Sequence, residues 1–451
     1  MPVYTVSHVQ NIRICVIMVG LPARGKSFIS QKIVRYLSWL SIKAKSFNVG
    51  NYRRRTEEHP SADFFDMHNS DGLKKRQQAA AAAVEDMMKW FSEEDGVVAI
   101  LDATNTTEER RDWLLKLCRE NFIEPMFLES WCNDDKIIMK NIMDVKTTSP
   151  DYVGCDPDAS AKDFIKRIEK YKEVYEPLTV EKNGDLTFVK LINVSEQVII
   201  NKIETYLESR IVYYVMNLHI RPRCIYLSRH GESAYNLEGK IGGDADLSER
   251  GYKYAQRLPQ LVKEAVGGDN DVSLTVWTST LKRTQQTAQF LPYHKLQWKA
   301  LDELDAGACD GLTYEEIEKQ FPQDFKERDE DKYEYRYRGG ESYRDVVIRL
   351  EPIIMELERQ ENILIITHQA VLRCIYAYFM NVPQEESPWM SIPLHTLIKL
   401  EPRAYSTLVQ RIKADIPAVS TYKEKGTSQL GEKLDGFNSS KNLITGAPLS
   451  Q

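Results

Sequence analysis

Short apolar runs alternate with segments of helical periodicity through the first half of the chain. Apolar residues fill Ile12–Val19 and Val97–Leu101, and a further candidate strand covers Ala44–Val49. Between the first two, Phe28–Leu40 repeats apolar residues at the spacing of one helix face. Compact apolar runs followed by amphipathic helices are typical of buried parallel strands. The pattern therefore predicts an α/β fold with a mostly parallel sheet.

The second half shows the same alternation. Cys224–Leu227, Leu274–Thr278 and Ile363–Thr367 read as buried strands. Between the two halves, His219–Arg223 interrupts the apolar pattern with a proline and reads as a linker. We therefore predict one α/β domain over residues 1–218 and a second over residues 219–413. Residues 414–451 are rich in Gly, Ser, Lys and Glu and are expected to form a disordered tail.

Serine and proline positions predict local features of the second domain. Ser248 is expected to cap the helix that follows it, because a serine hydroxyl accepts from an N–H group of the first helical turn. Ser279 is expected to do the same for the helix that contains Arg283. Pro259 falls inside the first of these helices, so we expect it to kink or shorten that helix.

Size and composition narrow the class of protein. A chain of 451 residues is longer than a domain with a single hydrophobic core usually is, so two domains are expected. A net charge of −6 gives no indication of nucleic-acid binding, and no apolar run has the length of a membrane span. The N-terminus lacks the pattern of a secretory signal. Seven cysteines without paired spacing fit reduced thiols, so we expect a cytoplasmic protein.

The first strand runs directly into G-L-P-A-R-G-K-S, which matches the phosphate-binding pattern G-x-x-x-x-G-K-[ST]. Backbone N–H groups of such a loop wrap nucleotide phosphates, the lysine contacts the terminal phosphates and the serine can bind Mg²⁺. A strand before the loop and a helix after it are the context that this motif requires. The sequence predicts ATP and Mg²⁺ as ligands, with nucleotide contacts from Gly20, Leu21, Pro22, Ala23, Arg24, Gly25, Lys26, Ser27 and Phe28.

A carboxylate and several basic clusters follow the other strands of this half. Asp102 ends the strand Val97–Leu101, where a carboxylate near Mg²⁺ is expected, and a polar loop of residues 104–107 follows it. Arginines or lysines occur at 53–55, 74–76, 110–111 and 167. Each cluster alone reads as a solvated basic face. Together, near strand ends, they favour an acceptor substrate that already carries phosphate.

Two histidines and two arginines lie at strand ends or helix starts of the second half. His230 follows Arg229 in L-S-R-H-G-E-S, His368 follows the strand Ile363–Thr367, and Arg283 lies in an early helical turn. A neutral imidazole can attack phosphorus while guanidinium groups carry the phosphoryl charge. The departing alkoxide then needs a proton from the acidic loop L-D-E-L-D. Glu303 is our choice there, although periodicity does not separate it from Asp302 or Asp305.

These motifs together resemble the family of bifunctional 6-phosphofructo-2-kinase/fructose-2,6-bisphosphatases, from about residue 12 to about residue 412. The quoted motifs are G-L-P-A-R-G-K-S, F-N-V-G-N-Y-R-R, L-D-A-T-N-T-T, S-P-D-Y, S-R-I-V-Y-Y, R-H-G-E-S, K-I-G-G-D and H-Q-A-V-L-R, in that order. The resemblance implies a P-loop kinase domain followed by a histidine-phosphatase domain of the phosphoglycerate mutase-like type. It also implies a homodimer formed through the kinase domains.

The resemblance implies site residues that the spacing alone does not. For the kinase it implies catalytic roles for Asp102 and Cys132, metal contacts from Ser27 and Asp102, and nucleotide contacts from Asn141 and Lys146. It implies that fructose 6-phosphate is bound by Arg53, Arg76, Thr104, Arg110, Arg167 and Tyr171. For the phosphatase it implies catalysis by Arg229, His230, Arg283, Glu303 and His368. It implies that fructose 2,6-bisphosphate is bound by Arg229, Asn236, Gly242, Glu303, Tyr314, Arg328, Lys332, Tyr343, Gln369 and Arg373.

Two departures and two rival interpretations accompany this assignment. Ala308-Cys-Asp-Gly-Leu differs from the acidic pair usual in the family, and Val194-Ser-Glu-Gln lacks an expected arginine. One rival is a mutase fused to a nucleotide kinase, because mutases also pass phosphate through histidine. The other is a sugar-phosphate sensor that binds without turnover. Intact Lys26, Asp102, His230 and Glu303 argue against the sensor.

Overall fold

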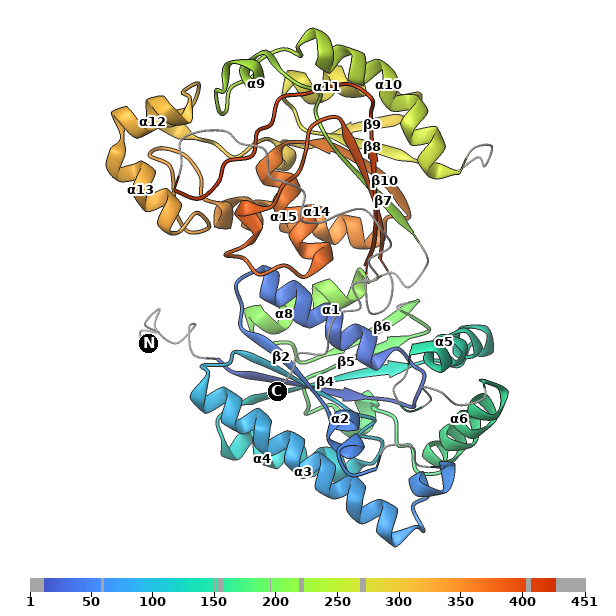
Figure 1. The fold of residues 1–451 in the computed structure, drawn as a ribbon. Coiled ribbons are helices and arrows are strands. Elements are labelled where there is room, and N and C mark those ends of the chain that lie inside the picture. Colours follow the sequence, from blue (N-terminus) through green and yellow to red (C-terminus); the bar gives the residue numbers. More distant parts are fainter. Residues whose placement is uncertain are drawn as a thin grey trace. The chain divides into compact units, whose positions relative to one another are not determined.

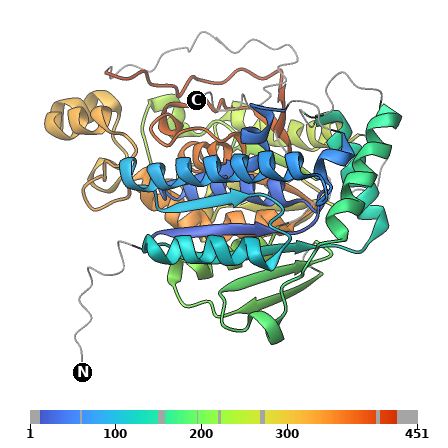
Figure 2. The ribbon, with the colours of Figure 1, turned by 90° about the horizontal axis from the view of Figure 1, so that it is seen from below.

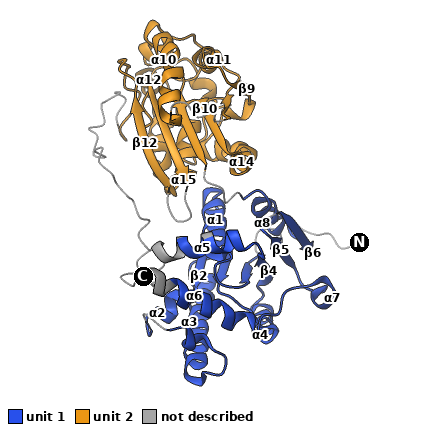
Figure 3. Ribbon diagram, turned by 90° about the vertical axis from the view of Figure 1, so that its right-hand side faces the viewer, with its two compact units in different colours: residues 1–218 blue, residues 219–451 orange. Residues whose placement is uncertain are grey.

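The computed structural model describes residues 12–57, 61–148, 151, 157–194, 196–218, 223–267, 273–402 and 407–426. The chain divides into two compact units, residues 1–218 and residues 219–451 (Figure 3). The division falls between Leu218 and His219, at the linker that the sequence indicated. Each unit is an α/β domain built on its own six-stranded sheet.

The sheet of the first unit is parallel except at one edge. Its strands lie in the order β2-β3-β1-β4-β5-β6, and only β6 runs antiparallel to its neighbour. The strands are β1 (Ile14–Val19), β2 (Ala44–Asn48), β3 (Val98–Asp102), β4 (Glu124–Trp131), β5 (Phe188–Ile192) and β6 (Gln197–Asn201). The strands predicted over Ile12–Val19, Ala44–Val49 and Val97–Leu101 are confirmed, with ends shifted by one or two residues.

Helices cover both faces of this sheet (Figures 1 and 2). They are α1 (Lys26–Trp39), α2 (Val49–Arg54), α3 (Ser70–Glu93), α4 (Glu108–Glu120), α5 (Asp135–Thr148), α6 (Pro157–Lys172), α7 (Val180–Asn183) and α8 (Tyr206–Met216). Cys15 and Ile17 of β1 pack in one core cluster with Met87 of α3 and Leu114 of α4. Successive strand residues point to opposite faces, so Val16 faces away from that cluster. On α1 and α8, the rings of Tyr36 and Tyr214 stack at 4.3 Å.

The sheet of the second unit has the order β12-β11-β7-β10-β8-β9. Strands β7, β10, β8 and β9 are parallel, whereas β11 and β12 form an antiparallel edge. The strands are β7 (Cys224–Arg229), β8 (Thr275–Thr278), β9 (His294–Gln297), β10 (Asn362–Thr367), β11 (Thr396–Pro402) and β12 (Thr407–Lys413). The three strands predicted from the sequence are β7, β8 and β10, which are adjacent in the sheet.

The helices of the second unit confirm one predicted cap, correct a second and exclude one of the two effects expected of Pro259. They are α9 (Ala234–Glu238), α10 (Glu249–Val266), α11 (Lys282–Ala288), α12 (Tyr314–Gln320), α13 (Pro322–Glu330), α14 (Tyr343–Arg359) and α15 (Gln369–Met380). Ser248 caps α10, as predicted, by accepting from the N–H of Gly251. Helix α10 runs on through Pro259, so this proline does not shorten it. The residue that precedes α11 is Leu281, and the Ser279 hydroxyl contacts His368 instead of capping.

The expected disordered tail is wrong for residues 414–426. These residues are described, and Lys423 is only 2% exposed. Its alkyl stem and ammonium lie against aromatic rings and a carboxylate contributed by distant parts of the unit, a setting that composition alone does not reveal. Residues 427–451 lie outside the described part of the chain. Within the described ranges, no helix combines the length and apolar character needed to cross a bilayer.

Candidate functional sites

The phosphate-binding loop contacts the chain at the ends of two strands of the first unit, β3 and β4. The N–H of Gly20 donates to the Thr104 carbonyl at 2.9 Å, just after β3. Gly20 has φ +136°, and a Cβ added there would lie 2.4 Å from the Ser130 carbonyl oxygen in β4. Only glycine fits both the backbone angle and the close approach. The loop therefore holds one conformation against its neighbours.

Lys26 and the start of α1 face this loop. Gly25 precedes the helix with φ 79°, and the first N–H groups of α1 lack partners one turn back, which makes the end electropositive. The Lys26 ammonium donates to the Leu21 carbonyl at 2.7 Å and is 7% exposed. Burial lowers the pKa of Lys26 to about 8, and the Asp102 carboxylate acts against that shift. The loop, the helix end and the ammonium together form a site for an anion.

Asp102 lies at the end of β3 beside this loop, as the sequence predicted. Its carboxylate accepts from the Asn48 amide at 2.5 Å, lies near the Ser27 hydroxyl, and is 5% exposed. Burial raises the pKa of Asp102. The carboxylate and hydroxyl are oxygen ligands of the type that Mg²⁺ prefers, and Mg²⁺ commonly takes its other ligands from water and substrate phosphates.

Cys132 and Asn141 hold the loop from the side. The guanidinium Nε of Arg24 donates to the Cys132 carbonyl, and the Asn141 amide donates to the Ala23 carbonyl, both at 3.0 Å. Burial raises the pKa of the Cys132 thiol, so it is neutral at ordinary pH. The contacts of Cys132 thus favour a role in positioning the loop over one as a nucleophile. The side chain of Lys146 lies outside the described residues.

Arg53 and Arg167, both predicted to bind sugar phosphate, meet around one carboxylate. Asp151 accepts from Arg53 at 2.5 Å, from Arg54 at 3.0 Å and from Arg167 at 3.1 Å. The ring of Phe65 lies under the Arg53 and Arg167 guanidinium groups, at 5.4 and 3.7 Å. Nε and Nη1 of Arg53 are buried without a hydrogen-bond partner among the described residues. Three guanidinium groups around one carboxylate leave a net positive charge for an anion.

The other predicted sugar-phosphate residues are spread around this cluster. The Tyr171 ring lies 6.0 Å from that of Phe65, and Arg76 donates to the Asp66 carbonyl at 3.1 Å. Thr104 contacts the phosphate-binding loop, while the Arg110 guanidinium lies over the Trp113 ring. The described contacts do not join these last two to the cluster. Sequence reasoning missed Asp151 as its centre, although S-P-D-Y was among the motifs noted.

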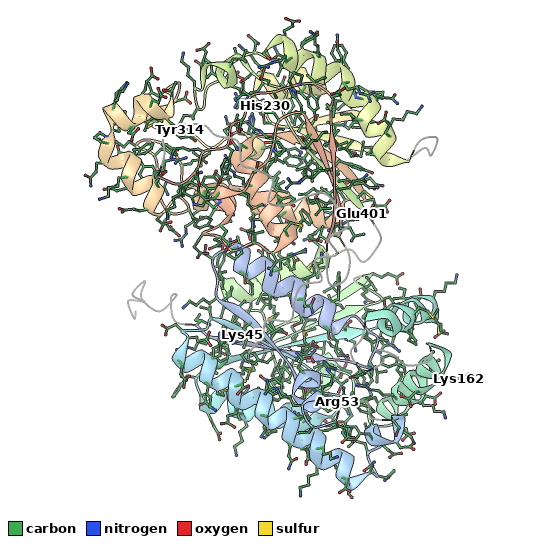
Figure 4. The ribbon with its side chains drawn as sticks, viewed as in Figure 1. Lys45, Arg53, Lys162, His230, Tyr314 and Glu401 are labelled. Carbon is green, nitrogen blue, oxygen red and sulfur yellow. The ribbon has the colours of Figure 1, made fainter. Side chains whose placement is uncertain are left out.

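In the second unit, parallel strands bring the two histidines together. His230 follows β7 and His368 follows the adjacent β10, and their ring centroids are 5.2 Å apart. His230, labelled in Figure 4, is 3% exposed. Its Nδ1–H donates to the Gly231 carbonyl at 2.7 Å, because a carbonyl can only accept. Nε2 therefore carries the lone pair that can attack phosphorus.

Arg283 links the second histidine to the rest of the site. Its Nε–H donates to Nδ1 of His368 at 3.1 Å, so Nε2–H of His368 donates to the Ser279 hydroxyl at 2.8 Å. Burial, together with the Arg283 and Arg229 charges, lowers the pKa of both His230 and His368 well below the usual range. Burial likewise lowers the pKa of Arg229 to about 9. Both imidazoles are therefore neutral in a strongly positive site.

The structure separates the three acids that the sequence left open. Asp302 accepts from the Thr280 N–H and hydroxyl at 2.7 and 2.8 Å, and Asp305 accepts from the Gly307 N–H at 2.8 Å. Glu303 accepts from the N–H groups of Gln369 and Ala370 at the start of α15. Of the three acids, Glu303 is the one that lines the pocket next to His230.

One pocket gathers most of the residues predicted for fructose 2,6-bisphosphate. The predicted residues in its lining are Arg229, His230, Asn236, Gly242, Arg283, Glu303, Tyr314, Arg328, Tyr343, Gln369 and Arg373. Lys332 and His368 are not among the residues that line it. Lys332 donates to the Pro388 carbonyl at 2.9 Å, and burial and nearby cations lower its pKa. The pocket thus has an attacking nitrogen at one side and several cations around it.

The departure at Ala308-Cys-Asp-Gly-Leu supports the loop that contains Gly242. The Asp310 carboxylate accepts from the Gly243 N–H at 2.7 Å, and a Cβ at Gly242 would lie 1.6 Å from the same oxygen. Gly311 has φ +78°, a conformation that glycine adopts without strain. Asp310 of this segment therefore has a structural role. The sequence missed a further lining residue, Thr421, because it placed that residue in a disordered tail.

Comparisons with known proteins match both units. The family model described as 6-phosphofructo-2-kinase matches residues 2–222, and that of histidine phosphatase superfamily (branch 1) matches residues 225–415. A relative from Saccharomyces cerevisiae named fructose-2,6-bisphosphatase is 66% identical, over 99% of this chain and 98% of its own length. Relatives named 6-phosphofructo-2-kinase/fructose-2,6-bisphosphatase include one from Aquarana catesbeiana, 49% identical over 91% of this chain and 87% of its own length. A relative from Homo sapiens, named 6-phosphofructo-2-kinase/fructose-2,6-bisphosphatase 1, is 48% identical over 91% of this chain and 86% of its own length.

Proposed function

Because the chain belongs to the family of bifunctional 6-phosphofructo-2-kinases/fructose-2,6-bisphosphatases, we propose that it both makes and hydrolyses fructose 2,6-bisphosphate. The first unit would transfer phosphate from ATP to the 2-hydroxyl of fructose 6-phosphate. The second would remove the same phosphate. The balance of the two activities would set the level of an effector that controls glycolysis and gluconeogenesis.

The kinase step relies on positioning and charge, since the protein supplies no covalent intermediate. The loop N–H groups and Lys26 hold the ATP phosphates. Asp102 and Ser27 would hold Mg²⁺, which neutralises charge on the phosphates when bound. Arg53 and Arg167 would bind the 6-phosphate of the sugar, which brings the 2-hydroxyl toward the transferred group. Its oxygen forms the new P–O bond, the bond between the terminal phosphorus and the ADP oxygen breaks, and the hydroxyl proton passes to water as ADP leaves.

The phosphatase step proceeds through phosphohistidine. Nε2 of His230 attacks the C2 phosphate and forms a P–N bond, while the P–O bond to C2 breaks. Glu303 gives a proton to the departing oxygen, and Arg229 and Arg283 stabilise the charge on phosphorus. Water then attacks the phosphohistidine and releases inorganic phosphate. The hydrogen bond that leaves Nε2 of His230 unprotonated, inside a positive pocket, is the observation that carries the proposal.

The relatives' names and the rival interpretations define what must be tested. The Saccharomyces cerevisiae relative is named for the phosphatase alone, whereas the other two are named for both activities. The buried and partnered Lys26 and Asp102 favour an active kinase here. A mutase would return the phosphate to an organic acceptor, and a sensor would bind sugar phosphate without turnover in either direction.

Both rates should be measured on the same purified full-length chain. We expect ATP-dependent formation of fructose 2,6-bisphosphate and its hydrolysis to fructose 6-phosphate and inorganic phosphate. Lys26→Met should abolish only the synthesis, and His230→Ala only the hydrolysis, so each variant is the control for the other. Labelled substrate should give an acid-labile phosphoenzyme that His230→Ala does not form. Organic phosphate as product, or a labelled His230→Ala protein, would contradict the assignment.

We further propose a homodimer through the first unit and a cytoplasmic location, as the family resemblance implies. Sedimentation of the full-length chain at several concentrations tests the first point, and a monomer at all concentrations would contradict it. Localisation of the tagged full-length chain by microscopy tests the second.

A further inference from the structure

A segment that follows the last strand runs along the phosphatase pocket. We name Ile416–Gly426 the C-terminal strap. Its first anchor is the Ile416 carbonyl, which accepts from the His395 ring at 3.2 Å. Further along, the Val419 N–H donates at 2.9 Å to Glu232, the acid two residues after His230. The strap is therefore bonded to the loop that carries the nucleophile.

Thr421 of the strap lines the pocket itself. Its hydroxyl accepts from Nη1 of Arg229 at 2.6 Å, and the same Nη1 donates to the Ile392 carbonyl at 3.0 Å. Arg229 precedes the nucleophile and is 3% exposed. A guanidinium held at two points keeps a fixed orientation, so its remaining N–H groups can point at a phosphate. Thr421 supplies one of those two points.

Lys423 of the strap packs against Tyr314, a residue of the pocket lining. Its ammonium donates to both carboxylate oxygens of Asp329, at 2.8 and 3.0 Å. It also lies over the rings of Phe325 and Tyr314, at 4.4 and 5.3 Å. Asp329 accepts in addition from the Gly426 N–H at 2.7 Å, so the same carboxylate also binds the last residue of the strap. These contacts make Lys423 one of the most buried lysines of the described chain, at 2% exposure.

Asp329 is shared between the strap and a pocket arginine. Nη1 of Arg328 donates to Asp329 at 2.7 Å, while its Nε and Nη2 contact the hydroxyls of Tyr337 and Tyr314. A buried carboxylate attracts whichever cation is available. With Lys423 in place, the Asp329 charge is balanced by the strap. Without it, Asp329 would compete directly with a substrate phosphate for Arg328.

We propose that two residues of the C-terminal strap, Thr421 and Lys423, support the phosphatase site. Lys423 is a positioning residue that balances Asp329, so that the Arg328 guanidinium remains available to the phosphate of the substrate distant from His230. Thr421 is a positioning residue that orients Arg229 beside the nucleophile. The inference rests on the proposed bisphosphatase activity of this pocket and adds to it a segment that the catalytic motifs do not include.

The first test replaces Lys423 in the full-length chain. Lys423→Met keeps the stem against the aromatic rings but removes the charge. We expect its KM for fructose 2,6-bisphosphate to rise about tenfold or more, the scale of one charge-assisted contact, with kcat within about threefold. Lys423→Arg should restore KM to within about threefold. The exposed Lys425→Met, two residues away, should behave as the unchanged chain.

A merely structural role predicts a different result. A partly unfolded second unit would lower kcat, leave KM unchanged and lower the thermal midpoint. In that case KM would be the same for Lys423→Arg and Lys423→Met. The double variant Lys423→Met with Asp329→Asn provides a second check. Because no unbalanced carboxylate then competes for Arg328, its KM should lie well below that of Lys423→Met. A KM equal to or above that of the single variant would overturn the role through Asp329.

The role of Thr421 is tested by a matched pair of substitutions. Thr421→Val keeps the shape but removes the acceptor of Arg229, so phosphoenzyme formation should slow about tenfold, while Thr421→Ser should stay within about threefold. Equal rates for the two variants would overturn this part. Kinase activity of every variant serves as an internal control.

If the unchanged chain hydrolyses no fructose 2,6-bisphosphate, the proposed function fails. If the unchanged chain does hydrolyse it and Lys423→Met has the same KM as Lys425→Met, only the strap inference fails.

Discussion

The protonation of His230 follows from its surroundings in the pocket. One ring nitrogen donates to the Gly231 carbonyl, and burial, together with two guanidinium groups, lowers the pKa so that the other nitrogen stays unprotonated. An imidazole at its ordinary pKa of about 6.5 would be half protonated, and so unable to attack, at a slightly acidic pH. The same cations that bind the phosphoryl group therefore keep the nucleophile ready.

This predicts how the phosphatase depends on pH. Because the folded pKa of His230 is lowered, the imidazole stays neutral as pH falls through about 6.5, and phosphoenzyme formation should persist below that value. Arg283→Gln removes one of the nearby positive charges, which raises the pKa of His230 and moves the acid limb to higher pH. Rapid-quench measurements of phosphoenzyme formation between about pH 5 and 8 would test this. The prediction would be contradicted if the rate of the wild-type chain fell with a midpoint near pH 6.5. It would also be contradicted if Arg283→Gln left that midpoint unchanged.

Contacts between distant residues explain which site residues the sequence could name. Arg229 and His230 stand in one contiguous motif, so the pattern sufficed. Glu303 stands among three acids, and the partners that set it apart from Asp302 lie far along the chain, Thr280 for Asp302 and Gln369 for Glu303. Thr421 lies almost two hundred residues from Arg229, in a stretch of tail-like composition. No local pattern marks such a pair.

At the scale of elements, the sequence predicted strands that are short and mainly apolar. Strands β1, β3, β7, β8 and β10 were found in this way, and β2 was also predicted although it contains Lys45 and Ser46, with small shifts at the strand ends. Strand β4 was missed, because Glu129 interrupts its apolar run. That carboxylate is fully buried and accepts from Tyr175 and Lys190. A buried charge with partners elsewhere in the chain reads as a surface residue until those partners are known.

The junction of β1, the phosphate-binding loop and α1 supports a prediction at this scale. Gly20→Ala would place a Cβ 2.4 Å from the Ser130 carbonyl and keep an alanine at φ +136°, so the loop must shift away from β4. We expect the kinase kcat/KM to fall more than tenfold, because a displaced loop no longer orients the phosphates. The phosphatase rate of the same protein should stay within about twofold. Assays of both activities, with a thermal melt as control, test this, and an unchanged kinase would contradict it.

At the scale of the whole molecule, one chain carries two units with opposing proposed reactions. Each unit has its own core and sheet, and the phosphatase pocket is lined only by residues of the second unit. The composition and length predicted two domains, and the motifs predicted their order. Each proposed site also holds contacts between distant residues, such as the arginines around Asp151 and the strap lysine at Asp329, and the motifs give no sign of these contacts.

The opposing reactions make a prediction that neither unit could show alone. With ATP, Mg²⁺ and fructose 6-phosphate present, the chain should raise fructose 2,6-bisphosphate to a plateau while ADP and inorganic phosphate continue to form. Synthesis and hydrolysis both scale with the amount of chain, so doubling the protein should speed the approach but leave the plateau unchanged. His230→Ala should remove the plateau, so that product accumulates and inorganic phosphate stops forming. Lys423→Met, with a weaker hold on the bisphosphate, should raise the plateau. Time courses of all three products at two protein concentrations test this, and a plateau that scales with the protein would contradict two opposing sites on one chain.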